Sequence, residues 1–163
     1  MLARQMNNKD PHVGKLSKAK EYALRVISHR PRTVWEIDKK LADKGYDSEI
    51  IALVIAFLKE YSFLDDESFT RMWIRSRTIG KPSGPRRIYA ELAQKRVDRE
   101  LIEQHLARLT PEKEEEMAIR LVESRCRKTG FNYNRLQGFL LRRGFNPGAV
   151  KKVLSECEKN YKE

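Results

Sequence analysis

One pattern occurs three times along the chain without a gap, and it restricts the fold to a tandem array. Each copy opens with a leucine, has an aromatic or aliphatic residue five positions later, and has aliphatic residues ten and fourteen positions later. The copies are residues 41–58, 92–109 and 140–157. A period of about 50 residues has room for three short helices. Arrays of this kind build extended surfaces, which favours a large binding partner over a small substrate.

The hydrophobic periodicity predicts an all-α protein. Apolar residues recur three and four positions apart, and no segment alternates as a half-buried strand would. Thr33, Asp47 or Ser48, and Asn132 are expected to cap the first turns of helices. Gly45 is expected to end a helix in the left-handed conformation, and Gly144 is expected to end another helix. We therefore predict three tandem three-helix repeats that form an elongated array.

The breaks between these patterns predict the domain boundaries. Residues 1–16 are polar and without periodicity, so we expect a disordered tail. The three repeats should span residues 17–63, 64–110 and 111–163. Because the links between them are short, the repeats should touch their neighbours.

The composition indicates a polyanionic partner. The 163 residues carry a net charge of +11, which favours nucleic acid or an acidic protein surface. No apolar run approaches the ~20 residues that span a bilayer, and the first residues do not resemble a secretory signal. Cys126 and Cys157 lack metal-site spacing, so we expect reduced core cysteines in a cytoplasmic protein.

Basic residues gather between positions 71 and 96, where Glu91 is the one acid. Arg71 and Arg75 are four residues apart and should share a helix face. Arg86 and Arg87 open the next helix, where free backbone N–H groups would add to the attraction of a phosphate or carboxylate. The residues predicted to contact DNA or a protein partner are Arg71, Arg75, Arg77, Lys81, Arg86, Arg87, Lys95, Arg96, Arg142 and Arg143.

No residue pattern predicts catalysis, a metal or a cofactor. The acidic residues 65–67 are expected to cap a helix, and Lys81 follows a glycine without the Ser or Thr of a phosphate loop. Trp35 and Trp73 are expected in the core rather than on bases, and His105 is expected to be a partly buried core residue. We therefore predict a protein that is not an enzyme.

Two blocks of the sequence are similar to a known family. Residues 63–69 (FLDDESF), followed by residues 84–95 (GPRRIYAELAQK), resemble the RecX family of regulators of the RecA recombinase. The resemblance covers about residues 17–156. Arg96 departs from it, because the family often has glycine there, which would make a better helix end.

The resemblance implies a function that the periodicity alone does not give. It implies three tandem three-helix units in a curved, all-α protein that binds the RecA–single-stranded DNA filament, lies along its groove and bridges its subunits. Such a protein would reduce the ATPase and strand-exchange activity of RecA in recombination and the SOS response. We also expect the protein to be a monomer. Single-stranded and double-stranded DNA are the expected nucleic-acid partners.

Two other classes remain open from the residues. Each repeat is a three-helix module, so a DNA-binding protein of the helix-turn-helix kind that acts without the recombinase is the main alternative. An RNA-binding or scaffolding array is supported by charge alone.

Overall fold

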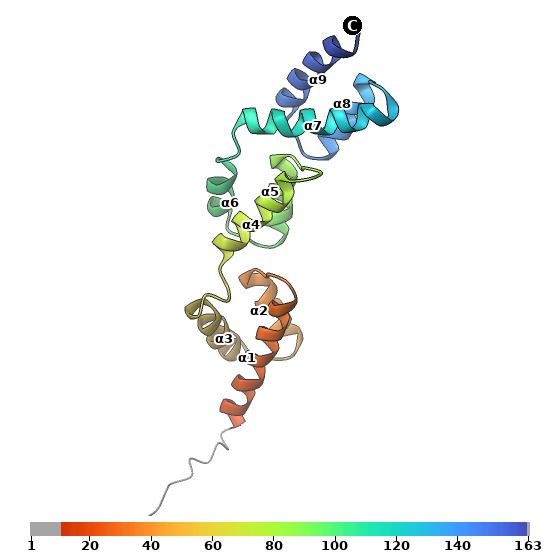
Figure 1. The fold of residues 1–163 in the computed structure, drawn as a ribbon. Helices are drawn as coiled ribbons and strands as arrows, with labels where there is room; N and C mark the ends of the chain where they lie inside the picture. Colours follow the sequence, from red (N-terminus) through yellow and green to blue (C-terminus); the bar gives the residue numbers. More distant parts are fainter. Residues whose placement is uncertain (1–10, 163) are drawn as a thin grey trace, which may run out of the picture. The chain divides into compact units, whose positions relative to one another are not determined.

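The computed structural model describes residues 11–162, and all regular secondary structure in that range is α-helical (Figure 1). The helices are α1 (Pro11–His29), α2 (Val34–Asp43), α3 (Ser48–Glu60), α4 (Asp66–Thr78), α5 (Pro85–Gln94), α6 (Arg99–Leu106), α7 (Pro111–Thr129), α8 (Tyr133–Arg142) and α9 (Pro147–Lys162). They follow one another as tandem helix triplets, which confirms the predicted all-α class. No helix within residues 11–162 is long and apolar enough to cross a lipid bilayer.

The chain divides into two compact units. The N-terminal unit contains α1 to α3 and the first residues of α4, through Phe69, and the C-terminal unit begins at Thr70. The predicted repeat boundaries after residues 63 and 110 lie in the connections from α3 to α4 and from α6 to α7. The division into three domains stays a prediction.

The same C-terminal cap closes α2, α5 and α8, and it explains the leucine of the sequence repeat. In each copy, the backbone N–H five positions after the leucine donates to the leucine carbonyl oxygen. The pairs are Tyr46 to Leu41, Val97 to Leu92 and Phe145 to Leu140, each at 3.2 Å. A hydrogen bond that spans six residues, with an apolar or aromatic side chain at each end, defines a Schellman motif. The repeat is therefore a helix end with its packing partner.

The residue before each apolar partner is in the left-handed conformation. Gly45 has φ of 84°, as predicted, Gly144 has the same φ, and Arg96 has φ of 56°. The N–H of Arg96 donates to the Ala93 carbonyl oxygen at 3.0 Å, so the arginine completes the same turn as the glycines. The departure from the family pattern therefore leaves the turn geometry intact.

Side-chain caps begin α2, α3, α6 and α8. The Asp47 carboxylate accepts the Ile50 N–H at 3.0 Å at the start of α3, and Asp98 does the same for α6. Thr33 forms a complete capping box with Glu36 on α2. Asn132 caps α8. The predictions for Thr33, Asp47 and Asn132 are confirmed.

The N-terminal unit is built around one apolar cluster. α1, α2 and α3 pack against one another, and Ile37, Leu41, Ile50 and Val54 are almost completely inaccessible. Trp35 was predicted in the core, but it is 38% exposed, with Lys39 Nζ 5.5 Å from its ring centroid. Two residues correspond to about 200° around a helix, so Trp35 and Ile37 lie on nearly opposite sides of α2.

The predicted tail is shorter than residues 1–16. Residues 1–10 lie outside the described range, so disorder there stays a prediction, but α1 already begins at Pro11. Leu16 packs against the apolar cluster of the N-terminal unit, and Lys15 forms a salt bridge with Asp47 at 3.1 Å. These two contacts extend the helix toward the N-terminus, where the polar composition had predicted disorder.

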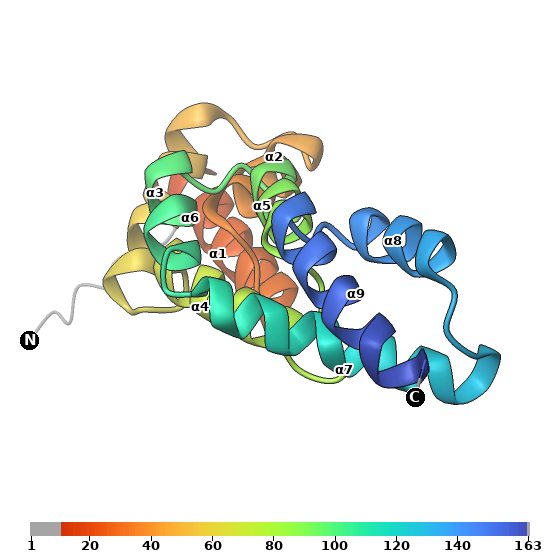
Figure 2. The ribbon, with the colours of Figure 1, turned by 90° about the horizontal axis from the view of Figure 1, so that it is seen from above.

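The C-terminal unit contains a second cluster, formed by α7, α8 and α9. α9 lies between α7 and α8 and packs against both (Figure 2). Phe145, Leu140 and Leu154 are fully buried there, and burying a side chain of this size contributes about 2–3 kcal/mol. Cys126 and Cys157 are buried and unbridged at the same cluster, in agreement with the prediction. Burial raises the pKa of the Cys157 thiol, with Cys126 nearby adding to the effect.

Candidate partner-binding surfaces

The predicted basic residues all belong to the C-terminal unit, and the structure divides them into separate sets. The first set is Arg71 and Arg75, which lie on α4. Arg96 stands apart from the sets, in the turn after α5. A second set, Arg77 and Lys95, surrounds a tryptophan. The third set comprises Lys81, Arg86, Arg87, Arg142 and Arg143, from the start of α5 and the end of α8.

The second set belongs to an internal polar network. Glu91 Oε2 accepts Nε1–H of Trp73 at 3.0 Å and Nε–H of Arg77 at 2.7 Å, and Oε1 accepts Nε–H of Arg87 at 3.2 Å. Arg77 and Lys95 also approach the Trp73 ring, at 4.5 and 4.8 Å from its centroid. Trp73 is half-buried and joins α4 to α5. Arg77 and Arg87 are therefore engaged in holding the fold, so they are weaker candidates for a partner contact.

The carboxylate at the centre of this network is held in its charged form. Burial alone would raise the pKa of Glu91, but the hydrogen bonds from Arg77, Arg87 and Trp73 outweigh it and lower the pKa below its usual value of 4.5. Charge-assisted hydrogen bonds of this kind stabilise the ionised acceptor. Glu91 is the one acidic residue between positions 71 and 96.

The third set is assembled by a backbone contact between two distant loops. The Gly84 N–H donates to the Arg143 carbonyl oxygen at 2.8 Å, and the Arg86 N–H donates to the Gly144 carbonyl oxygen at 3.1 Å. A Cβ on Gly84 would lie 2.3 Å from the Gly144 carbonyl carbon, so glycine is required for the approach. The guanidinium of Arg143 donates to the carbonyl oxygens of Pro82 at 2.9 Å and Lys81 at 2.6 Å.

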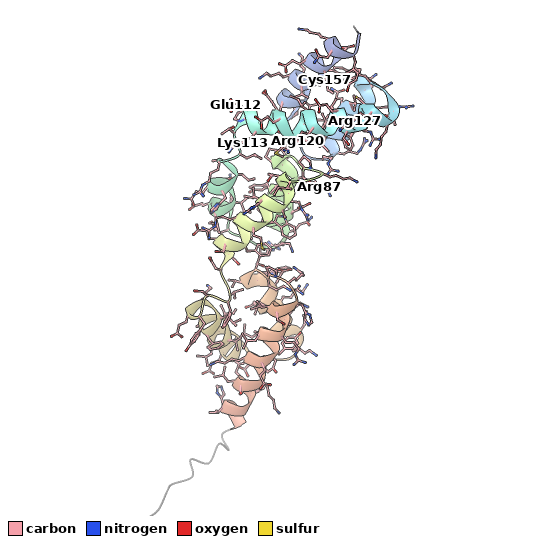
Figure 3. All side chains as sticks on the ribbon, in the orientation of Figure 1. Arg87, Glu112, Lys113, Arg120, Arg127 and Cys157 are labelled. Carbon is pink, nitrogen blue, oxygen red and sulfur yellow. The ribbon has the colours of Figure 1, made fainter. Side chains whose placement is uncertain are left out.

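This contact corrects one prediction about the start of α5. The N-terminal N–H groups were expected to be free for an anion, but the N–H of Arg86 is already bonded to Gly144. Arg143 is likewise committed to two carbonyl oxygens, and burial lowers its pKa, with Arg87 adding to the effect. Lys81, Arg86 and Arg142 remain exposed around the contact. We call these three residues the basic edge (Arg87, nearby on α5, is labelled in Figure 3).

The first set lines a cleft that the sequence did not reveal. Arg71 and Arg75 of α4 border a cavity of about 480 Å³, together with residues from the end of α6 and from α7. Its other lining residues are Ile74, Thr78, Ile79, His105, Arg108, Leu109, Lys113, Glu116, Met117 and Arg120. Lys113 and Arg120 both lie on α7 (Figure 3), and their spacing of seven residues puts them on one face of that helix. We call this feature the cationic cleft.

The cleft combines exposed cations with an apolar floor. Among the described residues, Arg75, Arg108, Lys113 and Arg120 make no salt bridge and are exposed. His105 is buried at its base, as predicted for a core histidine. Clustered like charges repel one another, so this arrangement lowers stability unless an anionic partner neutralises it.

The two aspartates at the start of α4 act as a helix cap and as an anchor. Asp65 accepts the N–H groups of Glu67 and Ser68 at 3.0 and 3.2 Å at the start of α4, which confirms the predicted cap. Asp66 accepts the Val34 N–H at 2.9 Å, and burial raises its pKa. No group of three or more potential metal ligands occurs in the part of the chain that the structure describes.

Family models match both units. The model of the first three-helix domain of RecX matches residues 19–58, and the model of the second three-helix domain matches residues 65–106. In the solved crystal structure of RecX from Lactobacillus salivarius, the same fold is found with a TM-score of 0.79 at 22% identity, covering 89% of this chain and 97% of that chain.

Relatives match over most of their own length. The regulatory protein RecX of Mycobacterium sp. (strain JLS) is 34% identical over 155 residues, which are 90% of this chain and 85% of the relative. The regulatory protein RecX of Treponema pallidum subsp. pallidum is 31% identical over 134 residues, which are 82% of this chain and 81% of the relative. Together with the matched domain models, these relatives show that the chain belongs to the RecX family of regulatory proteins.

Proposed function

We propose that the protein is a non-enzymatic regulator of homologous recombination and the SOS response that acts in the cytoplasm on the RecA–single-stranded DNA filament. It binds the filament and inhibits or modulates its ATPase and strand-exchange activity. The observation that carries the proposal is the basic edge on a chain of the RecX family. A regulator that acts by occupancy requires affinity for the filament and no chemistry of its own.

The basic edge is suited to phosphate contacts. Lys81, Arg86 and Arg142 come from loops and helix ends that the Gly84–Gly144 contact holds together, so the contact fixes the backbone positions from which their side chains extend. Guanidinium groups bind phosphate oxygens bidentately. Such contacts release counterions from the nucleic acid and make the affinity depend on salt.

The central experiment measures the DNA-dependent ATPase of RecA on single-stranded DNA while this protein is titrated below one copy per RecA subunit. Inhibition that develops on preformed filaments supports a filament-bound regulator. Undiminished ATPase together with tight binding to naked DNA would instead favour the DNA-binding protein that acts without the recombinase.

A pair of charge reversals tests the basic edge. Arg86→Glu/Arg142→Glu should weaken filament binding and reduce the slope of log K against log salt by about 0.7 for each lost single-strand phosphate contact. The control is Arg135→Glu/Lys151→Glu, which changes the net charge equally at exposed positions on α8 and α9. Equal binding by both variants would refute the assignment of the edge.

A further inference from the structure

The cationic cleft differs chemically from the basic edge. The edge consists of exposed charges around a backbone contact, whereas the cleft encloses about 480 Å³ and has aliphatic side chains between its cations. We infer that the cleft binds a short acidic amphipathic segment of a partner protein. This inference deepens the proposed function by naming the class of protein segment that the regulator holds, and it depends on that function only for the existence of a protein partner.

The charges around the cleft call for several carboxylates. Arg75 comes from α4, Arg108 from the residues after α6, and Lys113 and Arg120 from α7, so an occupant would meet positive charge from three directions. None of these four side chains has a salt-bridge partner among the described residues. Glu116 is the one acid that lines the cleft. An occupant with acidic residues at its margins would neutralise the repulsion between the cations.

Guanidinium groups fit carboxylate and phosphate equally well, so the cations alone do not distinguish a peptide from a nucleic acid. The apolar residues that line the cleft favour a peptide. Ile74, Ile79, Leu109 and Met117 supply the apolar surface, and Ile79 is 62% exposed. None of the described lining residues is Phe, Tyr or Trp, and the ring of His105 is almost fully buried. Single-stranded nucleic acids depend on open aromatic faces for base stacking. Aliphatic walls instead suit Leu, Ile or Met side chains.

The size of the cleft suits the anchor residues of one helix turn or two. Its volume lies within the range of about 300–1,000 Å³ that is typical of ligand sites. An amphipathic helix binds such a groove through apolar side chains at i, i+3 or i+4, and i+7, and its polar face remains outside. With glutamates beside these anchors, the segment would satisfy both the floor and the rim.

The test uses the full chain and two fluorescein-labelled peptides of about 15 residues, long enough for a helix to begin to form. One peptide places leucines at i, i+3, i+4 and i+7 among glutamates, and the other has the same composition with the leucines dispersed around the helix. Fluorescence anisotropy should show binding of the amphipathic peptide at least about tenfold tighter than of the scrambled one, as expected when apolar anchors are lost.

Cleft variants locate the binding. Arg75→Glu/Arg120→Glu should weaken binding of the amphipathic peptide by about tenfold or more. Each exposed arginine–glutamate pair contributes only modestly to binding, but the substituted glutamates would also repel the glutamates of the peptide. Ile79→Ser should also weaken it, and since Ile79 is mostly exposed, the protein should remain folded. The charge-matched Arg135→Glu/Lys151→Glu control should bind as the unaltered chain does.

Labelled oligothymidylate provides the opposing outcome. If the cleft variants weaken oligothymidylate more than the peptide, or if the amphipathic and scrambled peptides bind equally, the cleft is not a peptide site and the inference is overturned. Filament ATPase inhibition without peptide binding would overturn the inference and leave the proposed function standing. Peptide binding in the cleft without any effect on the filament would uphold the inference and remove the proposed function.

Discussion

Replacing Arg96 by glycine should stabilise the C-terminal unit. Arg96 has φ of 56° and occupies the turn position that Gly45 and Gly144 occupy after α2 and α8. Its N–H and that of Val97 already donate to Ala93 and Leu92, so the substitution leaves the turn's hydrogen bonds unchanged. The change therefore isolates the conformational energy of a left-handed L-residue.

The expected gain is the difference between two opposing terms. The left-handed conformation costs an L-residue about 1–2 kcal/mol, whereas glycine loses about 0.5–1 kcal/mol more than other residues on folding. The net stabilisation is then about 0.5–1 kcal/mol. For a domain of up to about 100 residues, this corresponds to a rise in Tm of about 2–8 °C.

The assay is denaturant and thermal unfolding followed by circular dichroism, with reciprocal substitutions at the two glycines. Gly45→Ala should destabilise by about 1 kcal/mol through conformation alone, because a Cβ there meets nothing within 4 Å. Gly144→Ala should cost more, because its Cβ would lie 2.4 Å from the Cβ and backbone nitrogen of Arg87. A lower or unchanged stability of Arg96→Gly, with an unchanged denaturant slope, would refute the assignment of strain to this residue.

Three further experiments test the packing and the surfaces. Glu91→Gln should lower the free energy of unfolding at neutral pH by about 1–2 kcal/mol. Because the pKa of Glu91 is lowered in the folded state, the difference between the two proteins should shrink as the pH falls through and below about 4.5. Unfolding measured as a function of pH would show this. Gly84→Ala should destabilise by about 2 kcal/mol or more, whereas Gly148→Ala, which has open space, should not; similar Tm values would contradict the tight contact. Arg75→Gln/Arg120→Gln should keep or raise Tm at low salt, because repulsion is relieved; a clear loss of Tm would show that these side chains hold the fold.

The helices and their ends could be predicted because their signals are local. Gly45, Gly144 and Asp47 act on residues only a few positions away, so their roles follow from the sequence itself. The opening leucine of each repeat was visible as a pattern, but its role as the acceptor of a Schellman bond required the backbone. The start of α1 was misjudged because one of its stabilising contacts joins Lys15 to Asp47, the residue that caps α3 and lies 32 positions away in the sequence.

The sequence identified the basic residues as a group, but it could not separate those that hold the fold from those that are available to a partner. The bond between Arg143 and the Lys81 carbonyl oxygen joins positions about sixty residues apart, and nothing in the sequence indicates that pairing. The salt bridge of Arg87 with Glu91 had a visible signal, since the two are four residues apart on one helix. Reading that spacing would have removed Arg87 from the candidates for partner contact.

The cationic cleft was not predicted because acidic and basic residues of α7 that are mixed along the sequence point to different sides of the helix in the structure. The segment that contains Lys113 is dominated by glutamates, so its sequence suggests an acidic helix start. In the structure, Glu114 is buried and accepts two hydrogen bonds from Asn146, and Glu115 pairs with Lys152 at 2.6 Å. Two acids are thus engaged away from the cleft, while Lys113 and Arg120 line it. A helix with mixed charge can therefore present a strongly basic face, and the tertiary partners of its acids determine which face that is.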